Sequence, residues 1–309
     1  MKCTRFCPAK VNLFLEVTGK RPNGYHELST LFAKIDLGDR LTVDAALAKK
    51  TSITLQITGP QRARIPANSH NLVCKAAQAF LDHYCLQARI HIKLDKHVPT
   101  GAGLGGGSSD AAGVLLSLCE IFHKDPMELL ELSATLGADV PLFLYPQTFL
   151  KGEGIGEKLT PLQAAENLPH LLLIYPCTAV STQQVFGRMH VPPAKDVLTN
   201  TAKLDKLIDA VRNGLPANEW GKLLFNRLEE YVLPYVPCVQ EALSALTQAN
   251  KGIGRMSGSG STVFTLVGTK QHVQELAEKM QHTKRLVFPV SFYRGPADAN
   301  YGDKSSSHG

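Results

Sequence analysis

Residues 99–110 read PTGAGLGGGSSD, and five of the seven residues in 101–107 are glycine. The preceding RIHIKL (89–94) alternates apolar and polar residues like a strand, and a helical pattern covers 108–122. A flexible linker is one interpretation of so much glycine. A glycine loop between a strand and a helix N-terminus is typical of an anion site, because the first-turn N–H groups have no partners. Three residues at the end of the loop offer N-cap side chains: Ser108, Ser109 and Asp110.

Known phosphate-binding motifs match this loop only in part. Gly101, Gly103 and Gly106 satisfy G-x-G-x-x-G, but the acidic residue that a dinucleotide fold carries about 20 residues later is missing. Protein kinases share the glycine pattern, yet the chain contains no HRD or DFG. A Walker A loop needs lysine where Gly107 stands. The cation that faces a phosphate must therefore come from elsewhere, and the candidates are Lys10 and Lys96.

The rest of the chain mixes strands and helices. AKVNLFLEV (9–17) alternates, with Lys10, Asn12 and Glu16 on its more polar face, and a helical pattern covers 71–84. A strand-like 171–175 precedes helix-rich sequence, and RMSGSGSTVFTLV is a turn that leads into a strand. Hairpins before helices favour an α+β fold over a doubly wound sheet. We expect domains at 1–158 and 159–294, and a disordered tail at 295–309.

Composition excludes some classes of protein. The 309 residues carry a net charge of +6, with no run of 18 apolar residues and no apolar segment at the start, which predicts neither a membrane span nor a secretion signal. Seven scattered cysteines predict free thiols in a reducing cytoplasm rather than disulfides or a zinc site. The dispersed positive charge suits a small anionic ligand and gives little support for nucleic-acid binding.

Five motifs occur in order: PAKVNLFL, GYHEL, PTGAGLGGGSSDAAG, GADVPLFL and MSGSGSTVF. Together they resemble the GHMP kinases, over about residues 7–267. The resemblance implies two α+β domains, the first similar to the second domain of ribosomal protein S5. The sequence looks most like those members of the family that move the γ-phosphoryl group of ATP to the 2-hydroxyl of a cytidine diphosphate-linked methylerythritol. That reaction serves non-mevalonate isoprenoid synthesis in the bacterial cytoplasm.

The resemblance also implies site residues, each of which has a plainer interpretation. Lys10 and Asp139 match the catalytic pair, although a strand lysine is usually solvated and an Asp before Val-Pro often caps a turn. Tyr25 and His26 match the cytosine-binding pair, although such a pair is usually surface packing. The further substrate residues are Asn12, Thr182 and Phe186.

The ATP site implied by the resemblance contains the glycine loop, the start of the helix at 71–84 and one lysine. By itself, that helix start suggests only an N-cap. Its residues are Pro99, Thr100, Gly101, Ala102, Gly103, Leu104, Gly105, Gly106, Gly107, Ser108, Ser109, Asn71, Leu72 and Lys96. Mg²⁺ is expected with ATP, within reach of Ser108, but no carboxylate cluster in the sequence defines a metal site.

Without the resemblance, the residues alone leave other classes of protein possible. A dehydrogenase would need the missing acidic residue, and a nucleotide- or RNA-binding module without catalysis would not need Lys10 and Asp139 together. A homoserine or mevalonate kinase would not need the aromatic residues of a cytosine site. We expect a monomer or a homodimer, with no nucleic-acid or membrane partner.

Overall fold

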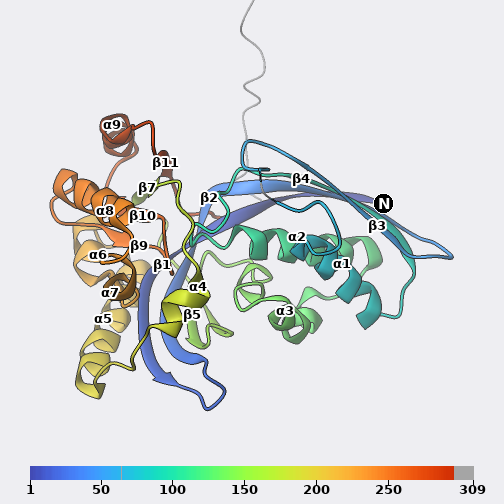
Figure 1. Ribbon diagram of the computed structural model, residues 1–309, viewed down its shortest axis with the longest axis horizontal. Helices are drawn as coiled ribbons and strands as arrows, with labels where there is room; N and C mark the ends of the chain where they lie inside the picture. The colour runs from blue at the N-terminus through green and yellow to red at the C-terminus, as the bar shows by residue number, and fades with distance from the viewer. Residues whose placement is uncertain (64, 296–309) are drawn as a thin grey trace, which may run out of the picture.

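The computed structural model describes residues 1–63 and 65–295. In this part of the chain the strands form two sheets (Figure 1). The first has the order β3-β4-β2-β1-β8, and β5 pairs with β2 and β6 with β5. Its strands are β1 (Lys2–Lys20), β2 (His26–Leu47), β3 (Ser52–Thr58), β4 (Ala88–Asp95), β5 (Phe149–Gly154), β6 (Lys158–Leu162) and β8 (Phe225–Asn226).

Strands β1 and β2 make one long antiparallel hairpin that runs through both halves of the molecule. The predicted strand 9–17 is confirmed as part of β1, which extends beyond it at both ends. The register shifts between Pro8 and Ala9, between Asn12 and Phe14, and between Val17 and Gly19. Such bulges bend and twist a strand, and the hairpin can therefore serve two separate cores.

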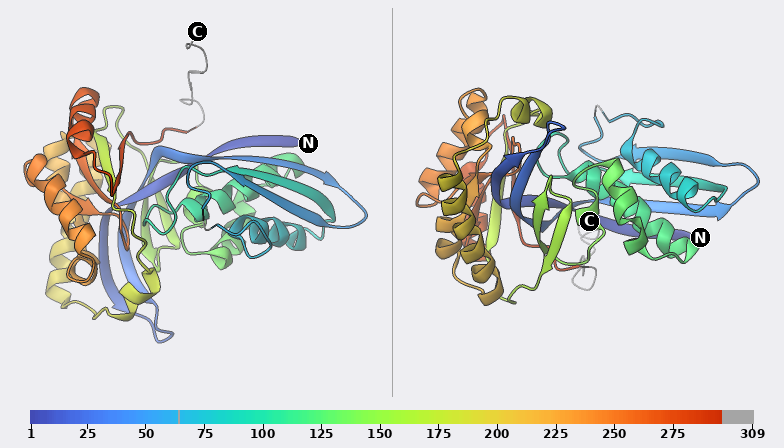
Figure 2. Two further views of the ribbon diagram at one scale, coloured as in Figure 1. Left: turned by 45° about the horizontal axis from the view of Figure 1, so that its top comes forward. Right: turned by 90° about the horizontal axis from the view of Figure 1, so that it is seen from below.

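The outer part of the first sheet is covered by the helices of the first half of the chain, shown in green and teal in Figure 2. Their apolar faces form one core with Leu41, Val43, Ile90 and Ile92 of the sheet. These helices are α1 (Leu72–His83), α2 (Gly106–Phe122), η1 (Pro126–Leu129), α3 (Leu130–Leu136) and η2 (Pro141–Phe143).

The second sheet has the order β11-β7-β10-β9, and the yellow to red helices of Figure 2 pack around it. Its strands are β7 (His170–Tyr175), β9 (Arg255–Met256), β10 (Val263–Val267) and β11 (Leu286–Val290). The helices are α4 (Thr182–Gly187), α5 (Ala194–Asn213), α6 (Ala217–Leu223), α7 (Glu229–Val232), α8 (Pro237–Ala249) and α9 (Lys270–Met280). Mixed helix and strand order confirms the α+β class.

The two sheets share a core, because residues of β1 and β2 pack with residues of β7, β10, α5 and α6. The ring of Phe149 contacts those of Trp220 and Phe292, with centroids 6.1 and 4.8 Å apart. The domain boundary near residue 158 stays a prediction. The first sheet continues past it to Leu162 in β6, and β8 joins the same sheet from the second half of the chain. The predicted tail falls almost wholly on residues 296–309, outside the described residues.

Two findings bear on the classes of protein considered above. None of the helices in the described residues has the length and apolar character that crossing a bilayer requires. All seven cysteines are free thiols.

Candidate functional site

A cleft of about 1110 Å³ lies where the β1–β2 hairpin, the glycine loop, α4 and the turn after β9 meet. It brings together the predicted catalytic, ATP-binding and substrate residues from distant parts of the sequence. Ser109 alone among them is not part of the lining; it is buried, and its amide donates to Gly105 O inside α2. Their roles remain predictions, but their convergence is a property of the fold.

Lys10 and Asp139 face each other in this cleft. Lys10 Nζ lies 3.4 Å from Asp139 Oδ2 and donates to Asn12 Oδ1 at 2.7 Å. The ammonium group also lies 5.4 Å from the centroid of the Phe32 ring. Lys10 is only 5% exposed, because the glycine loop, the ring of Phe32 and the turn at Gly258 pack around it. The alternative of a solvated strand lysine is therefore wrong.

Asp139 lies in the turn between α3 and η2, just after Gly137 ends α3. Its side chain is 33% exposed, so the carboxylate is accessible from the cleft while it contacts Lys10. A carboxylate that is both accessible and next to a cation suits the binding of a substrate hydroxyl.

Asn12 holds Lys10 in place. Its Oδ1 accepts from the lysine, and its Nδ2 donates to Thr30 Oγ1 at 2.9 Å. Thr30 in turn donates to Phe14 O at 2.6 Å, across the β1–β2 pair. Asn12 therefore orients the lysine here, and its predicted contact with substrate stays a prediction.

The glycine loop differs in detail from the sequence prediction. Helix α2 begins at Gly106, two residues before the predicted start, and its N-cap is Gly105 with φ +68°. Ser108, Ser109 and Asp110 do not cap it, so no side chain satisfies the first-turn N–H groups. The prediction of a side-chain N-cap is wrong, and the backbone geometry is that of an anion site.

Close packing explains two of the glycines. A Cβ on Gly103, whose φ is +77°, would lie 2.3 Å from Ser257 O. A Cβ on Gly105 would lie 3.0 Å from Lys10 Cγ. By contrast, a Cβ on Gly107 would meet nothing within 4 Å, although Gly107 lines the cleft. The space beside Gly107 is therefore room for a ligand.

Lys96 lies beneath the loop with its charge already compensated. Its Nζ donates to Asp110 Oδ2 at 2.8 Å and to Asp39 Oδ2. Burial alone would lower the pKa of Lys96, but the two carboxylates outweigh burial and raise it. Burial also raises the pKa of Asp110, an effect that Lys96 opposes and Asp39 reinforces. Of the two candidate phosphate-facing cations, the structure therefore favours Lys10.

Asp39 extends this cluster to the backbone before the loop. Its Oδ1 accepts from the amides of His97 and Val98, at 2.5 and 2.8 Å. The cluster Asp39–Lys96–Asp110 thus connects β2, the end of β4 and the first turn of α2. It supports the loop from below.

Two rings meet at the end of the cleft formed by the hairpin tip and α4. His26 and Phe186 have ring centroids 5.5 Å apart and an interplanar angle of 30°. His26 Nε2 is buried with no hydrogen-bond partner among the described residues. Burial, helped by the charge of Lys20, lowers the pKa of His26, so the imidazole is neutral at pH 7. A neutral ring nitrogen can donate to or accept from a heterocyclic ligand.

The neighbouring predicted residues flank this ring pair differently. Tyr25, at the hairpin tip, is 61% exposed. This exposure agrees with the plainer interpretation, in which the tyrosine lies on the surface. Thr182 begins α4, and its hydroxyl lies 2.7 Å from Ser259 Oγ. At the other side of the cleft, Asn71 Oδ1 accepts from Val73 N at 3.1 Å, which confirms the N-cap interpretation.

Three parts of the site were not predicted from the sequence. They are Thr30 and Phe32 on β2, the turn Ser257–Gly260, and Asn226, which holds that turn. The SGSG repeat was visible as a motif, and its serines and glycines were the signal for a tight turn. Thr30, Phe32 and Asn226 carry no local signal, since only strand pairing places them here.

Comparison with known proteins agrees with this geometry. Residues 71–147 match the family model "GHMP kinases N terminal domain", and residues 203–285 match "GHMP kinases C terminal". A 4-diphosphocytidyl-2-C-methyl-D-erythritol kinase of Deinococcus radiodurans is 37% identical, over 88% of this chain and 86% of the relative. The enzyme of the same name from Methylacidiphilum infernorum is 41% identical, over 84% and 85%.

Solved structures give the same picture. The crystal structure of a 4-(cytidine 5'-diphospho)-2C-methyl-D-erythritol kinase matches with a TM-score of 0.73 and 32% identity, over 94% of this chain and 99% of that one. A homoserine kinase from Cytophaga hutchinsonii matches with a TM-score of 0.76 but 17% identity, which shows a shared fold alone. The chain belongs to the GHMP kinases and, within them, to the 4-diphosphocytidyl-2-C-methyl-D-erythritol kinase family.

Proposed function

We propose that the protein transfers the γ-phosphoryl group of ATP to the 2-hydroxyl of 4-diphosphocytidyl-2-C-methyl-D-erythritol. One observation carries the proposal. The Lys10–Asp139 pair, the glycine loop and the His26–Phe186 ring pair line the same cleft. A kinase with a heterocyclic acceptor needs these three parts together.

At the reacting centre, Asp139 orients the acceptor hydroxyl and takes its proton as the hydroxyl oxygen attacks the γ-phosphorus. The bond from that phosphorus to the β–γ bridging oxygen breaks, and ADP leaves. Lys10 offsets the negative charge on the phosphoryl group in flight. Asn12 and the ring of Phe32 keep the ammonium group in place for this role.

ATP fits the glycine loop, because the uncapped amides of α2 face the open space beside Gly107. Asn71 and Leu72, at the start of α1, line the same cleft and would border the adenine. The described residues contain no group of three or more His, Cys, Asp or Glu side chains placed to hold a metal. Mg²⁺ would be held here by Ser108 together with phosphate oxygens, and it would supply charge neutralisation.

The ring pair of His26 and Phe186 determines which acceptor substrate the cleft prefers. A flat base can stack on His26 and Phe186 and hydrogen-bond to the free Nε2, while Tyr25 at the hairpin tip covers it. Acceptors without a base gain nothing from these residues. This favours the cytidine-linked acceptor over homoserine or mevalonate.

A coupled ADP-release assay tests the proposal, with the cytidine-linked acceptor, homoserine and mevalonate offered at equal concentration. We expect ADP release with the first alone. Equal turnover of mevalonate or homoserine would contradict the assigned acceptor, and no turnover of any of the three would contradict a kinase acting on them.

A further inference from the structure

Asn226 is a buried residue that joins the two halves of the molecule at the cleft. It belongs to the two-residue strand β8, which pairs in parallel with Phe14 and Leu15 of β1. Its Nδ2 donates to Met256 O at 2.7 Å and to Gly258 O at 2.8 Å. Its Oδ1 accepts from Leu228 N at 2.9 Å. The side-chain amide is thus fully engaged, and both donors hold carbonyls of the Ser257–Gly260 turn or its approach.

That turn lies against Lys10 and its partner Asn12. A Cβ on Gly258 would lie 3.2 Å from Asn12 Oδ1 and 3.4 Å from Lys10 Nζ. Ser257 Oγ accepts from Asn12 N at 3.3 Å and donates to Gly103 O at 3.1 Å. The turn therefore contacts both the surroundings of Lys10 and the glycine loop, next to the place where the proposed function puts the phosphoryl group.

The hydrogen bond to Gly258 O determines where the next amide points. In a trans peptide the C=O and the following N–H point in opposite directions. With Gly258 O directed at Asn226, the N–H of Ser259 points away from Asn226. This N–H has no hydrogen-bond partner among the described residues, and Ser259 lines the cleft.

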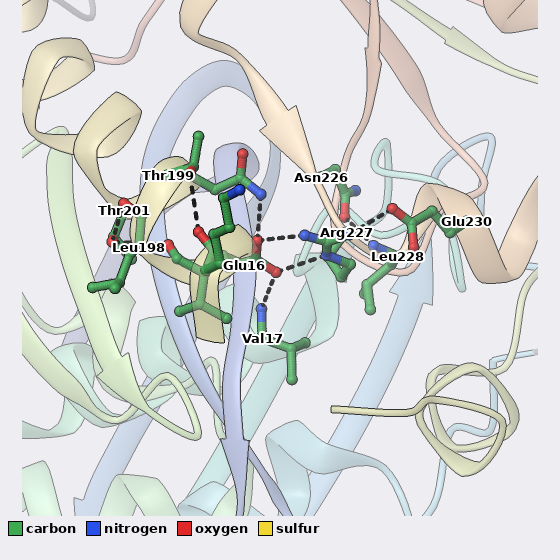
Figure 3. Close-up of polar contacts among 12 residues, drawn as sticks. Glu16, Val17, Leu198, Thr199, Thr201, Asn226, Arg227, Leu228 and Glu230 are labelled. Atoms are coloured by element: carbon green, nitrogen blue, oxygen red, sulfur yellow. Dashed lines mark hydrogen bonds and ion pairs between the residues drawn. The ribbon is translucent and has the colours of Figure 1, made fainter. Parts of the chain in front are cut away.

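The strand that carries Asn226 is firmly held. Its neighbour Arg227 donates to both carboxylate oxygens of Glu16 at 2.8 Å (Figure 3). Asn200 Nδ2 donates to the same carboxylate at 2.7 Å. Arg227 N also donates to Leu15 O at 2.8 Å. A buried, two-pronged ion pair of this kind leaves little freedom to its neighbours in the chain.

We propose that Asn226 is a positioning residue for phosphoryl transfer. It orients the 258–259 peptide so that the Ser259 N–H donates to the anionic phosphoryl oxygens beside Lys10. A preorganised amide of this kind acts on the charge of the transition state and needs no reorganisation during the reaction. The inference rests on the kinase activity proposed above, and it adds a backbone donor from the second half of the chain.

Asn226→Ala tests the proposal against Asn250→Ala, a second buried asparagine whose Nδ2 donates to Thr265 Oγ1 and Leu266 O, away from the turn. Removing one such donor typically lowers kcat by about 10²–10³-fold, and we expect about 10²-fold for Asn226→Ala with KM for ATP near the wild-type value. Asn250→Ala should lower the melting temperature but keep kcat. Equal kcat losses in the two variants, or a wild-type kcat in Asn226→Ala, would overturn the proposal.

An NMR measurement on the unaltered protein gives a readout that folding defects do not affect. In protein labelled with ¹⁵N-serine, the Ser259 amide is assigned by its loss in Ser259→Ala. Adenylyl imidodiphosphate with the cytidine-linked acceptor should shift this resonance, and it should shift much less in Asn226→Ala. A resonance that does not move in the wild type would overturn the proposal. Failure of the wild type to release ADP would instead contradict the proposed function.

Discussion

Two regions of the same cleft each contain a buried lysine, and the chain uses them in different ways. Lys96 faces two carboxylates that are themselves almost wholly buried, whereas Lys10 faces one accessible carboxylate and a neutral amide. In the first region the carboxylates compensate the charge, and the cluster supports the glycine loop. In the second the ammonium group remains available to a phosphoryl group. The difference lies in how many carboxylates surround each lysine and how deeply they are buried.

Lys96→Met should give the largest effect, and it acts on stability. It leaves Asp39 and Asp110 together and buried without a cation, and breaking such a pair typically costs about 3–5 kcal/mol. Lys10→Met leaves the accessible Asp139 and the buried amide oxygen of Asn12 without their donor, and we expect a smaller loss of about 1–3 kcal/mol. Urea unfolding of the two variants measures both values.

The matched rescue is the double variant Lys96→Met with Asp110→Asn. It removes one of the two stranded carboxylates and should recover part of the lost unfolding free energy. If the double variant is less stable than Lys96→Met, the charge cluster is not what holds this region together.

Asp139→Asn should have the largest effect on chemistry. It keeps the shape of the side chain and removes the proton acceptor, so kcat should fall by about 10²–10⁴-fold, as is usual for general-base assistance. ATP affinity, measured by calorimetry, should hardly change. A loss of tenfold or less with substrate bound normally would mean that positioning and charge carry the reaction without a base.

Lys10→Ala should also lower kcat, because it removes the charge that faces the phosphoryl group. Combined with Asp139→Asn it should be little worse than the worse single variant, since groups that act as a unit are not additive. Effects that simply multiply would show that the two residues act independently.

Gly107→Leu should act on ATP alone. A Cβ here meets nothing within 4 Å, and leucine favours the helix, so the fold tolerates the change. The side chain then occupies the space assigned to phosphate, and we expect ATP to bind about tenfold more weakly, about 1.4 kcal/mol. Unchanged ATP affinity in calorimetry would move the phosphates away from this turn.

Phe186→Ala should give the smallest effect, at the acceptor. An aromatic pair contributes about 0.5–1.5 kcal/mol, so KM for the cytidine-linked acceptor should rise by a few-fold to about tenfold. KM for ATP should stay the same, which serves as the internal control. A rise in KM for both substrates would indicate a general disturbance of α4 instead.

Much of the local structure was predictable from the sequence. Alternation located β1 and β4, and helical spacing located α1 and α2, because residues on a buried face must repeat with the period of the element. The glycine loop was predictable for a related reason, since a strand, several glycines and a helix start leave backbone amides free. The start of α2 was misplaced by two residues, because Gly105 ends the loop in a left-handed conformation that leaves the serines inside the helix.

Motif resemblance identified the residues of the site, but it did not determine how they are arranged. Lys10 and Lys96 were equal candidates in the sequence, and only the carboxylates that the fold packs around each one separate them. His26 and Phe186 lie 160 positions apart in the chain, and their ring contact exists because α4 packs beside the hairpin tip. Asn226 had no signal at all, because its partners are backbone carbonyls that carry no sequence information.

The sequence by itself thus determined several strands and helices, the glycine loop and the family, all of which depend on periodicity or on short motifs. The tertiary structure alone decided which lysine two buried carboxylates compensate, that both faces of β1 are buried over residues 9–17, and which backbone carbonyls Asn226 binds. The physical reason is that charge compensation and burial depend on neighbours brought together by the fold. Those neighbours come from both halves of the chain, and no local pattern records them.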